Sequence, residues 1–178
     1  DSGPQVIERP FNVLKDENVT LTDAQLARLF ELRQQVGELQ ARLDMATRTA
    51  NQIKEHVDQA EDAMELVDDL AESVTEMAEQ LGDDVDDVIE KLRGAPRRPG
   101  QGGSTDPPAV RQNLQAAAGV NRATAMPTAR ELAALEAVPD ALDAEIARLN
   151  EMLTERMPAF FRALDDAGVP WTPGRPIR

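Results

Sequence analysis

Few side chains in this sequence of 178 residues have the chemistry and spacing that catalysis or metal binding requires. Cysteine is absent, which excludes disulfides, thiol catalysis and thiolate metal sites. His56 is the only histidine, so the chain cannot build a metal site from a pair of histidines or a relay that uses two. We interpret His56 as a solvated surface residue, and we assign no catalytic residue to the chain.

Carboxylates are abundant, and some of them form the adjacent pairs Asp68-Asp69, Asp83-Asp84 and Asp86-Asp87. A calcium-binding loop needs oxygen ligands at alternating positions and a glycine at its turn, and these pairs lack that spacing. Adjacent carboxylates on a helix point in different directions, so we interpret the pairs as a solvated helical face. No glycine-rich loop follows a strand, and a phosphate site is therefore unsupported. The sequence predicts no cofactor, no metal site and no enzymatic activity.

The charge balance restricts the class of partner. The chain has 33 acidic residues against 19 lysines and arginines, which gives a formal net charge of −14. A surface of this sign repels the phosphate backbone of nucleic acids and the anionic headgroups of membranes. No run of about 18 apolar residues occurs, so we expect no membrane span. The composition therefore argues against nucleic acids and anionic membrane surfaces as partners.

Apolar residues recur at alternating intervals of three and four between Leu29 and Leu92. This spacing is typical of long amphipathic helices that pack along a seam. We therefore predict an all-α fold, an elongated antiparallel helical bundle of three long helices and one short helix. An extended strand-like segment precedes the bundle, and an extended tail follows it. The predicted boundaries are 1–20 for the first segment, 21–168 for the bundle and 169–178 for the tail.

The first predicted helix begins after Thr22, which forms a capping box with Gln25. A single helix from there to the end of the seam at Gly94 would be about 105 Å long, with no partner for half of it. We therefore expect a hairpin that turns near residues 57–62, because this gives two arms of about 35 residues that match the later helix. A turn at Gly82 and a continuous helix in a homodimeric coiled-coil rod are the alternatives.

Glycine and proline divide the second half of the chain. Residues 94–107 have the composition of a flexible linker, and we expect residues 97–105 to be the most mobile part. A short helix is then predicted, with Asp106 as its cap and Pro107 as its first residue, ending by Gly119.

A second capping box, formed by Thr128 and Glu131, predicts the start of the last long helix. Its apolar stripe includes Leu153, and prolines interrupt it. We expect bends at Pro139 and Pro158, or a break near Pro139, because proline lacks the backbone donor and clashes with the preceding turn. Gly168 is the predicted C-cap.

The two ends of the chain do not have a helical pattern. Residues 6–14 contain β-branched and aromatic residues in partial alternation and predict one extended strand, although no partner strand follows. The tail contains the only tryptophan, placed between prolines. We predict that residues 5–15 and 169–177 lie extended and that at least one of the two is buried against a partner or the bundle. The candidate docking residues are Val6, Phe11, Val13, Leu14, Trp171 and Ile177.

The order of these features is similar to a known protein family. A segment Phe11-Asn12-Val13-Leu14-Lys15-Asp16 leads through Leu21-Thr22-Asp23 into paired helices, and Met126-Pro127-Thr128 opens the last long helix. That helix contains Leu149-Asn150-Glu151-Met152-Leu153, and Ala167-Gly168-Val169-Pro170-Trp171 follows it. Nearly the whole chain resembles the C-terminal helical region of large secreted bacterial proteins with sortilin-like β-propellers, often labelled glycosyl-hydrolase-like. It departs where that family commonly has Asp-Pro-Arg, because this chain has Asp16-Glu17-Asn18.

The resemblance implies that the N-terminal segment is the last strand of a missing immunoglobulin-like domain. It also implies a periplasmic or extracellular location, and it carries over no catalytic residue. Because the sequence begins with Asp1 rather than Met, we expect a processed chain whose export signal has been removed.

The sequence predicts a non-catalytic interaction protein that docks as an accessory or scaffold subunit on a larger envelope-side complex. The alternative is the accessory C-terminal domain of a secreted propeller-type carbohydrate-active enzyme. A homodimer stays open as a third arrangement.

Overall fold

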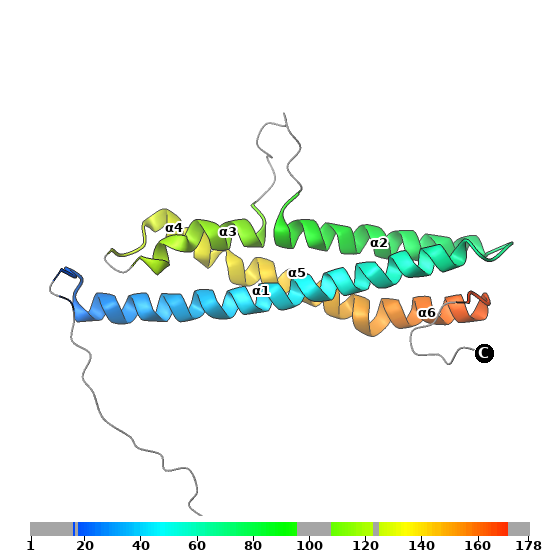
Figure 1. Ribbon diagram of the computed structural model, residues 1–178, viewed down its shortest axis with the longest axis horizontal. Helices are drawn as coiled ribbons and strands as arrows, with labels where there is room; N and C mark the ends of the chain where they lie inside the picture. The colour runs from blue at the N-terminus through cyan, green and yellow to red at the C-terminus, as the bar shows by residue number, and fades with distance from the viewer. Residues whose placement is uncertain (1–15, 17, 96–107, 123–124, 171–178) are drawn as a thin grey trace, which may run out of the picture.

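The computed structural model describes residues 16, 18–95, 108–122 and 125–170. All regular secondary structure in these residues is helical, which confirms the predicted all-α bundle (Figure 1). Three arms lie along the long axis of the molecule, and the second arm runs antiparallel to the first and the third (Figure 1). The predicted strand-like segment and tail fall mostly outside the described residues.

The first arm is α1 (Asp23–Met64), a helix of 42 residues. Its start is the predicted capping box: the Thr22 hydroxyl accepts the backbone N–H of Gln25 at 3.2 Å, and the Gln25 side chain accepts the backbone N–H of Thr22 at 2.8 Å. These two bonds satisfy donors that a helix start otherwise leaves without partners. At about 1.5 Å per residue, α1 is about 63 Å long and sets the length of the bundle.

The hairpin turns at residues 65–71, so both predicted turn positions are wrong. Val57 is buried in the middle of α1, and Gly82 lies inside α2 (Glu72–Arg93). Apolar spacing does not reveal the turn because Val67 and Leu70, which lie within it, also pack against the core. The apolar seam thus continues through a segment that is not helical.

The predicted continuous rod is also wrong in this structure. The helix does pass residue 60 without a break, as that arrangement required, but it ends at Met64. The chain then reverses and α2 packs back against α1. The seam that a second chain would have covered is therefore covered within the molecule.

The second arm consists of two helices placed end to end. With 22 residues, α2 is shorter than α1, and α3 (Val110–Ala116) continues along the same arm toward the other end of the bundle (Figure 1). The end of α2 and the start of α3 are adjacent, since Gly94 lies against Gln112 and Ala109. A 3₁₀ turn, η1 (Ala117–Asn121), ends the arm.

The cap predicted for the short helix is wrong. The N-cap of α3 is Ala109, not Asp106, and helical structure begins at Val110. The sequence Pro107-Pro108 explains the difference, because the second proline disfavours a helical conformation for the first. This explains why the helix does not begin at Pro107.

The third arm comprises α4 (Ala129–Glu136), α5 (Val138–Glu151), the π-helical turn η2 (Met152–Arg156) and α6 (Met157–Asp166). The capping box of Thr128 and Glu131 is present, which confirms the predicted start. The predicted break near Pro139 is confirmed as well, since α4 ends before Ala137 and α5 begins after it.

Near Pro158 the helix does not end but widens into the turn η2. Met152 and Met157 are both buried although they lie five residues apart, and a π turn accommodates one extra residue in this way. Leu153, which the sequence assigned to the apolar stripe, is consequently 45% exposed. That part of the predicted stripe is wrong, and Met152 and Met157 take its place in the core.

The core is a continuous column between the three arms. Full burial of a large apolar side chain contributes about 1.5–3 kcal/mol relative to exposure. The largest fully buried side chains come from every long helix: Leu29, Leu43, Ile53, Leu81, Leu92, Leu142, Phe160 and Leu164.

Candidate functional site

The six predicted docking residues lie outside the described residues. Val6, Phe11, Val13 and Leu14 fall in 1–15, and Trp171 and Ile177 fall in 171–178. The linker segment 97–105 lies outside as well. These expectations stay predictions.

His56 lies on α1 next to the buried Val57 and is itself half-buried. In the part of the chain that the structure describes, no group of three or more histidine and acidic side chains is arranged to hold a metal ion. Within the same residues, no helix is long and apolar enough to cross a membrane.

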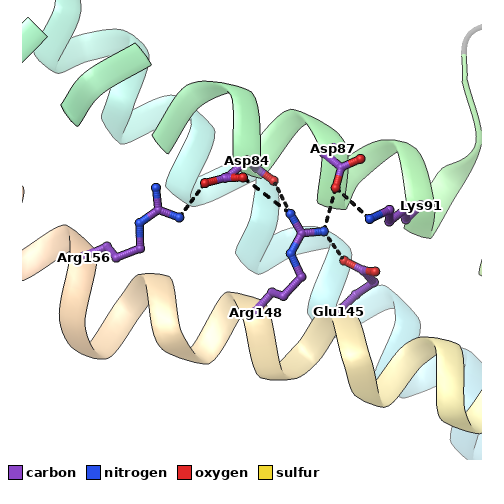
Figure 2. A network of polar contacts seen from close by, with 6 residues as sticks. All are labelled: Asp84, Asp87, Lys91, Glu145, Arg148 and Arg156. Carbon is purple, nitrogen blue, oxygen red and sulfur yellow. Dashed lines mark hydrogen bonds and ion pairs between the residues drawn. The ribbon is translucent and has the colours of Figure 1, made fainter. Parts of the chain in front are cut away.

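A network of charged side chains joins the second and third arms (Figure 2). Arg148 of α5 is at its centre: its Nη1 atom lies 2.7 Å from Asp87 Oδ2 and 3.0 Å from Glu145 Oε2. Its Nη2 atom lies 3.7 Å from the carboxylate of Asp84. Arg156, at the end of η2, donates to the other oxygen of Asp84 at 2.6 Å. Each arginine therefore bridges from the third arm to α2.

The network is balanced in charge. Asp84, Asp87 and Glu145 supply three carboxylates, and Arg148, Arg156 and Lys91 supply three cations (Figure 2). Lys91 Nζ lies 2.8 Å from Asp87 Oδ2. All six groups pair within the network, and the contacts of Arg148 and Arg156 join the third arm to α2.

The pKa values follow from these contacts. The hydrogen bond from Lys91, and then the one from Arg148, holds the pKa of Asp87 below its ordinary value. Burial alone lowers the pKa of Arg148, but the hydrogen bond to Asp87 and the charge of Glu145 raise it overall. Both shifts favour the charged forms of Asp87 and Arg148.

The aspartate pairs on α2 agree with the predicted solvated face: Asp83, Asp86 and Asp87 are exposed, and the side chain of Asp84 is 43% exposed. The sequence did not predict that Asp84 and Asp87 also pair with arginines of the third arm. Asp68 and Asp69 are exposed, but they lie in the hairpin turn rather than on a helix. No sequence signal marks this network, because Arg148 and Arg156 are ordinary surface residues until the third arm is packed against α2.

A second feature is the solvent-facing side of α1. Eight exposed residues follow one another at intervals of three or four and form one row, which we call the outer stripe: Ala27, Phe30, Gln34, Gly37, Ala41, Met45, Arg48 and Gln52. The row itself contains no acidic residue, but exposed acidic residues surround it: Asp23 and Glu55 continue its spacing at the two ends, and Glu31 and Glu38 lie beside it. The row extends for about 38 Å along the helix.

Two large apolar side chains stand out in the outer stripe. Phe30 and Met45 are each 59% exposed, in a chain with only four phenylalanines. Between them, Gly37 has no neighbouring atom within 4 Å of the position of a β-carbon, so the backbone there is open to solvent. Gly37 and Ala41 lie between Phe30 and Met45, and their small size leaves room for another helix to approach the backbone of α1 closely.

No family model matches the chain, and comparisons with curated proteins and with solved structures find no match. The resemblance to the propeller-bearing secreted proteins therefore stays a prediction from the sequence.

Proposed function

We propose that this chain is a non-catalytic protein-interaction module that docks, as an accessory or scaffold subunit, on a larger assembly at the envelope side of the cell. The observation that supports the proposal is the outer stripe of α1. The location comes from the sequence resemblance alone.

The stripe fits a helix of a protein partner. Its length of about 38 Å, set by α1, is that of a long helix–helix contact. Gly37 and Ala41 allow the partner's backbone to come close, while Phe30 and Met45 would lie at either side of that contact. Glu38 is exposed beside the row, so a partner helix with basic side chains along one edge matches the charge.

The experiment is affinity purification of the tagged full-length chain from its native source under native conditions. We expect one larger protein to co-purify at a fixed stoichiometry. Ala41→Glu places a charge and added bulk at the centre of the outer stripe and should abolish this co-purification. Circular dichroism and the thermal midpoint should stay unchanged, because residue 41 is exposed.

Ala141→Glu is the matched control, since Ala141 is an exposed alanine on α5. It should retain the partner. A wild-type chain that purifies as a monomer without a partner would contradict the proposal, and so would an Ala41→Glu chain that binds like wild type. A doubled mass in light scattering would indicate that the stripe binds a second copy of the chain instead.

A second candidate, the accessory domain of a carbohydrate-active enzyme, is favoured by the sequence resemblance, in which the strand-like run of residues 6–14 precedes the capping box at Thr22. The mass of the intact native polypeptide distinguishes it. A much longer chain that loses glycosidase activity when trimmed to Asp1 would support this candidate.

A further inference from the structure

A short motif at the start of the bundle has no part in the proposed function. Asn18-Val19-Thr20 has a threonine two positions after an asparagine, which is the spacing of an acceptor for an N-linked glycan. The middle residue is valine and not proline, as such an acceptor requires. The chain has six asparagines, and none of the other five has serine or threonine two positions later.

The motif lies on a turn that precedes the helices. The N–H of Val19 donates to the carbonyl of Asp16 at 3.0 Å, and helical structure begins only after Thr22. Asn18 and Thr20 are exposed, and Val19 between them is half-buried. A transferase has to reach the amide and the hydroxyl together, and both are open to solvent on this non-helical segment.

Asp16 holds the amide of Asn18. Its Oδ1 atom accepts the backbone N–H of Asn18 at 2.8 Å and the side-chain Nδ2 of Asn18 at 3.0 Å. An amide nitrogen is a weak nucleophile because its lone pair is delocalised into the carbonyl group. A hydrogen bond to a carboxylate is stronger than one to a neutral acceptor and increases the electron density on the donor nitrogen. Asp16 therefore orients and polarises the nitrogen that would react.

The position of the motif on the bundle leaves space for a bulky group. It lies next to the start of α1, at the opposite end of the bundle from the hairpin turn (Figure 1). From Asp23 to Ala41, α1 rises by about 27 Å, so the motif is well separated from the centre of the outer stripe. A glycan at Asn18 is thus compatible with a partner bound at Ala41.

We propose that Asn18 is the acceptor of an N-linked glycan and that Asp16 positions its amide. The inference rests on the envelope-side location in the proposed function, because such glycans are attached to exported chains. The donor is a sugar carried on a lipid diphosphate. A bond forms between Nδ2 of Asn18 and the anomeric carbon of the sugar, and the bond from that carbon to the diphosphate breaks. The diphosphate leaves with the electron pair, and one Nδ2 proton passes to a base of the transferase.

Mass spectrometry of the full chain from its native source tests the proposal. Trypsin releases the motif in a peptide of residues 16–28, because Lys15 and Arg28 are the flanking cleavage sites. We expect this peptide to exceed the mass of its sequence by whole sugar residues, with fragment ions that place them on Asn18.

Variants of the motif separate the roles of its side chains. Asn18→Gln and Thr20→Ala should remove the added mass, while Thr20→Ser keeps the hydroxyl and should retain it. Asp16→Ala should lower the modified fraction several-fold. Asp16→Glu keeps a carboxylate and should restore most of the modification. Modification in Asp16→Ala that equals that of wild type would overturn the role assigned to Asp16.

A native peptide 16–28 that has only the mass of its sequence overturns the proposal. An added mass that persists in Asn18→Gln also overturns it, because the sugar is then attached to a hydroxyl group. The proposed function is tested separately by co-purification of the partner. An unmodified peptide from a chain that retains its partner contradicts the glycan alone, and a modified peptide from a chain without a partner contradicts the proposed function alone.

Discussion

The carboxylate of Glu131 lies directly over the α-carbon of Gly119, where the first turn of α4 packs against η1. The same carboxylate accepts the backbone N–H of Thr128 at 2.7 Å and pairs with Arg122. The bond from Thr128 is the main reason that the pKa of Glu131 is below its ordinary value. A β-carbon at residue 119 would overlap this carboxyl group, so only glycine allows the cap and the packing together.

We predict that Gly119→Ala lowers the free energy of unfolding by about 0.5–2 kcal/mol, the usual cost of losing a helix cap, because the clash is with the end of a flexible side chain that takes part in the cap. The added methyl group must displace the Glu131 side chain and so break the capping box. Urea denaturation measures the change. The double variant Gly119→Ala/Glu131→Ala should lose less stability than the sum of the losses of the two single variants, because both substitutions act on one contact. Strict additivity would show that Gly119 and Glu131 are independent.

The hairpin turn leads to a second prediction. Asp69 has a φ of 60°, a left-handed conformation that glycine adopts without strain and other residues rarely adopt. Asp69→Gly should therefore raise the free energy of unfolding by about 1 kcal/mol. Asp68→Gly is the control, and it should give no gain because Asp68 does not have a positive φ. A loss of stability in Asp69→Gly would show that the turn depends on the aspartate side chain.

This turn also shows where the sequence was insufficient. The capping boxes at Thr22 and Thr128 place two helix starts correctly because each is a local signal of four residues. The hairpin turn has no such signal, since Val67 and Leu70 keep the apolar spacing and no glycine or proline interrupts it. Only Asp69 carries a conformational cost there, and aspartate alone is too common in this chain to be informative.

The candidate sites also depend on packing that the sequence alone does not show. The arginines of the network are ordinary surface residues in the sequence, and their partners on α2 follow only when α5 is packed against α2 in the right register. Arg156 also lies at the end of the π-helical turn η2, which the sequence did not predict. The outer stripe of α1 was present in the sequence, but it could not be separated from the core seam until the structure showed which side of the helix is covered.

Two carboxylates should affect stability with opposite signs as the pH changes. Burial raises the pKa of Glu61, and the charge of Asp58 raises it further. The folded state therefore binds this proton more tightly than the unfolded state, and ionised Glu61 lowers stability at pH 7. Glu61→Gln should be more stable at pH 7 by a few tenths of a kcal/mol, since the group is partly exposed. The gain should disappear as the pH falls below the ordinary value of 4.5.

Asp87 is the opposite case, because Lys91 and Arg148 lower its pKa. Ionised Asp87 therefore stabilises the folded state at pH values above its ordinary pKa of 3.8. This stabilisation is lost as the pH falls through the lower pKa that Asp87 has in the folded state. Asp87→Asn should therefore be less stable than wild type at pH 7 and equal to it in strong acid. Thermal denaturation at a series of pH values from neutral to acidic measures both variants. A difference in stability from wild type that does not change with pH would contradict the pKa shifts assigned to Glu61 and Asp87.

The last prediction tests the course of the chain itself. Gly82 lies inside α2, where a β-carbon would be 3.9 Å from the Val57 side chain and 4.0 Å from Glu61, both ordinary contact distances. Alanine is more favourable than glycine in a helix interior by about 1 kcal/mol, so Gly82→Ala should stabilise the protein by about that amount. Gly37→Ala, on the open side of α1, serves as the reference and should give a similar gain. If the chain turned at Gly82 instead, alanine there would be strained and the first variant alone would lose stability. Urea midpoints of the two variants therefore distinguish a hairpin at residues 65–71 from one at Gly82.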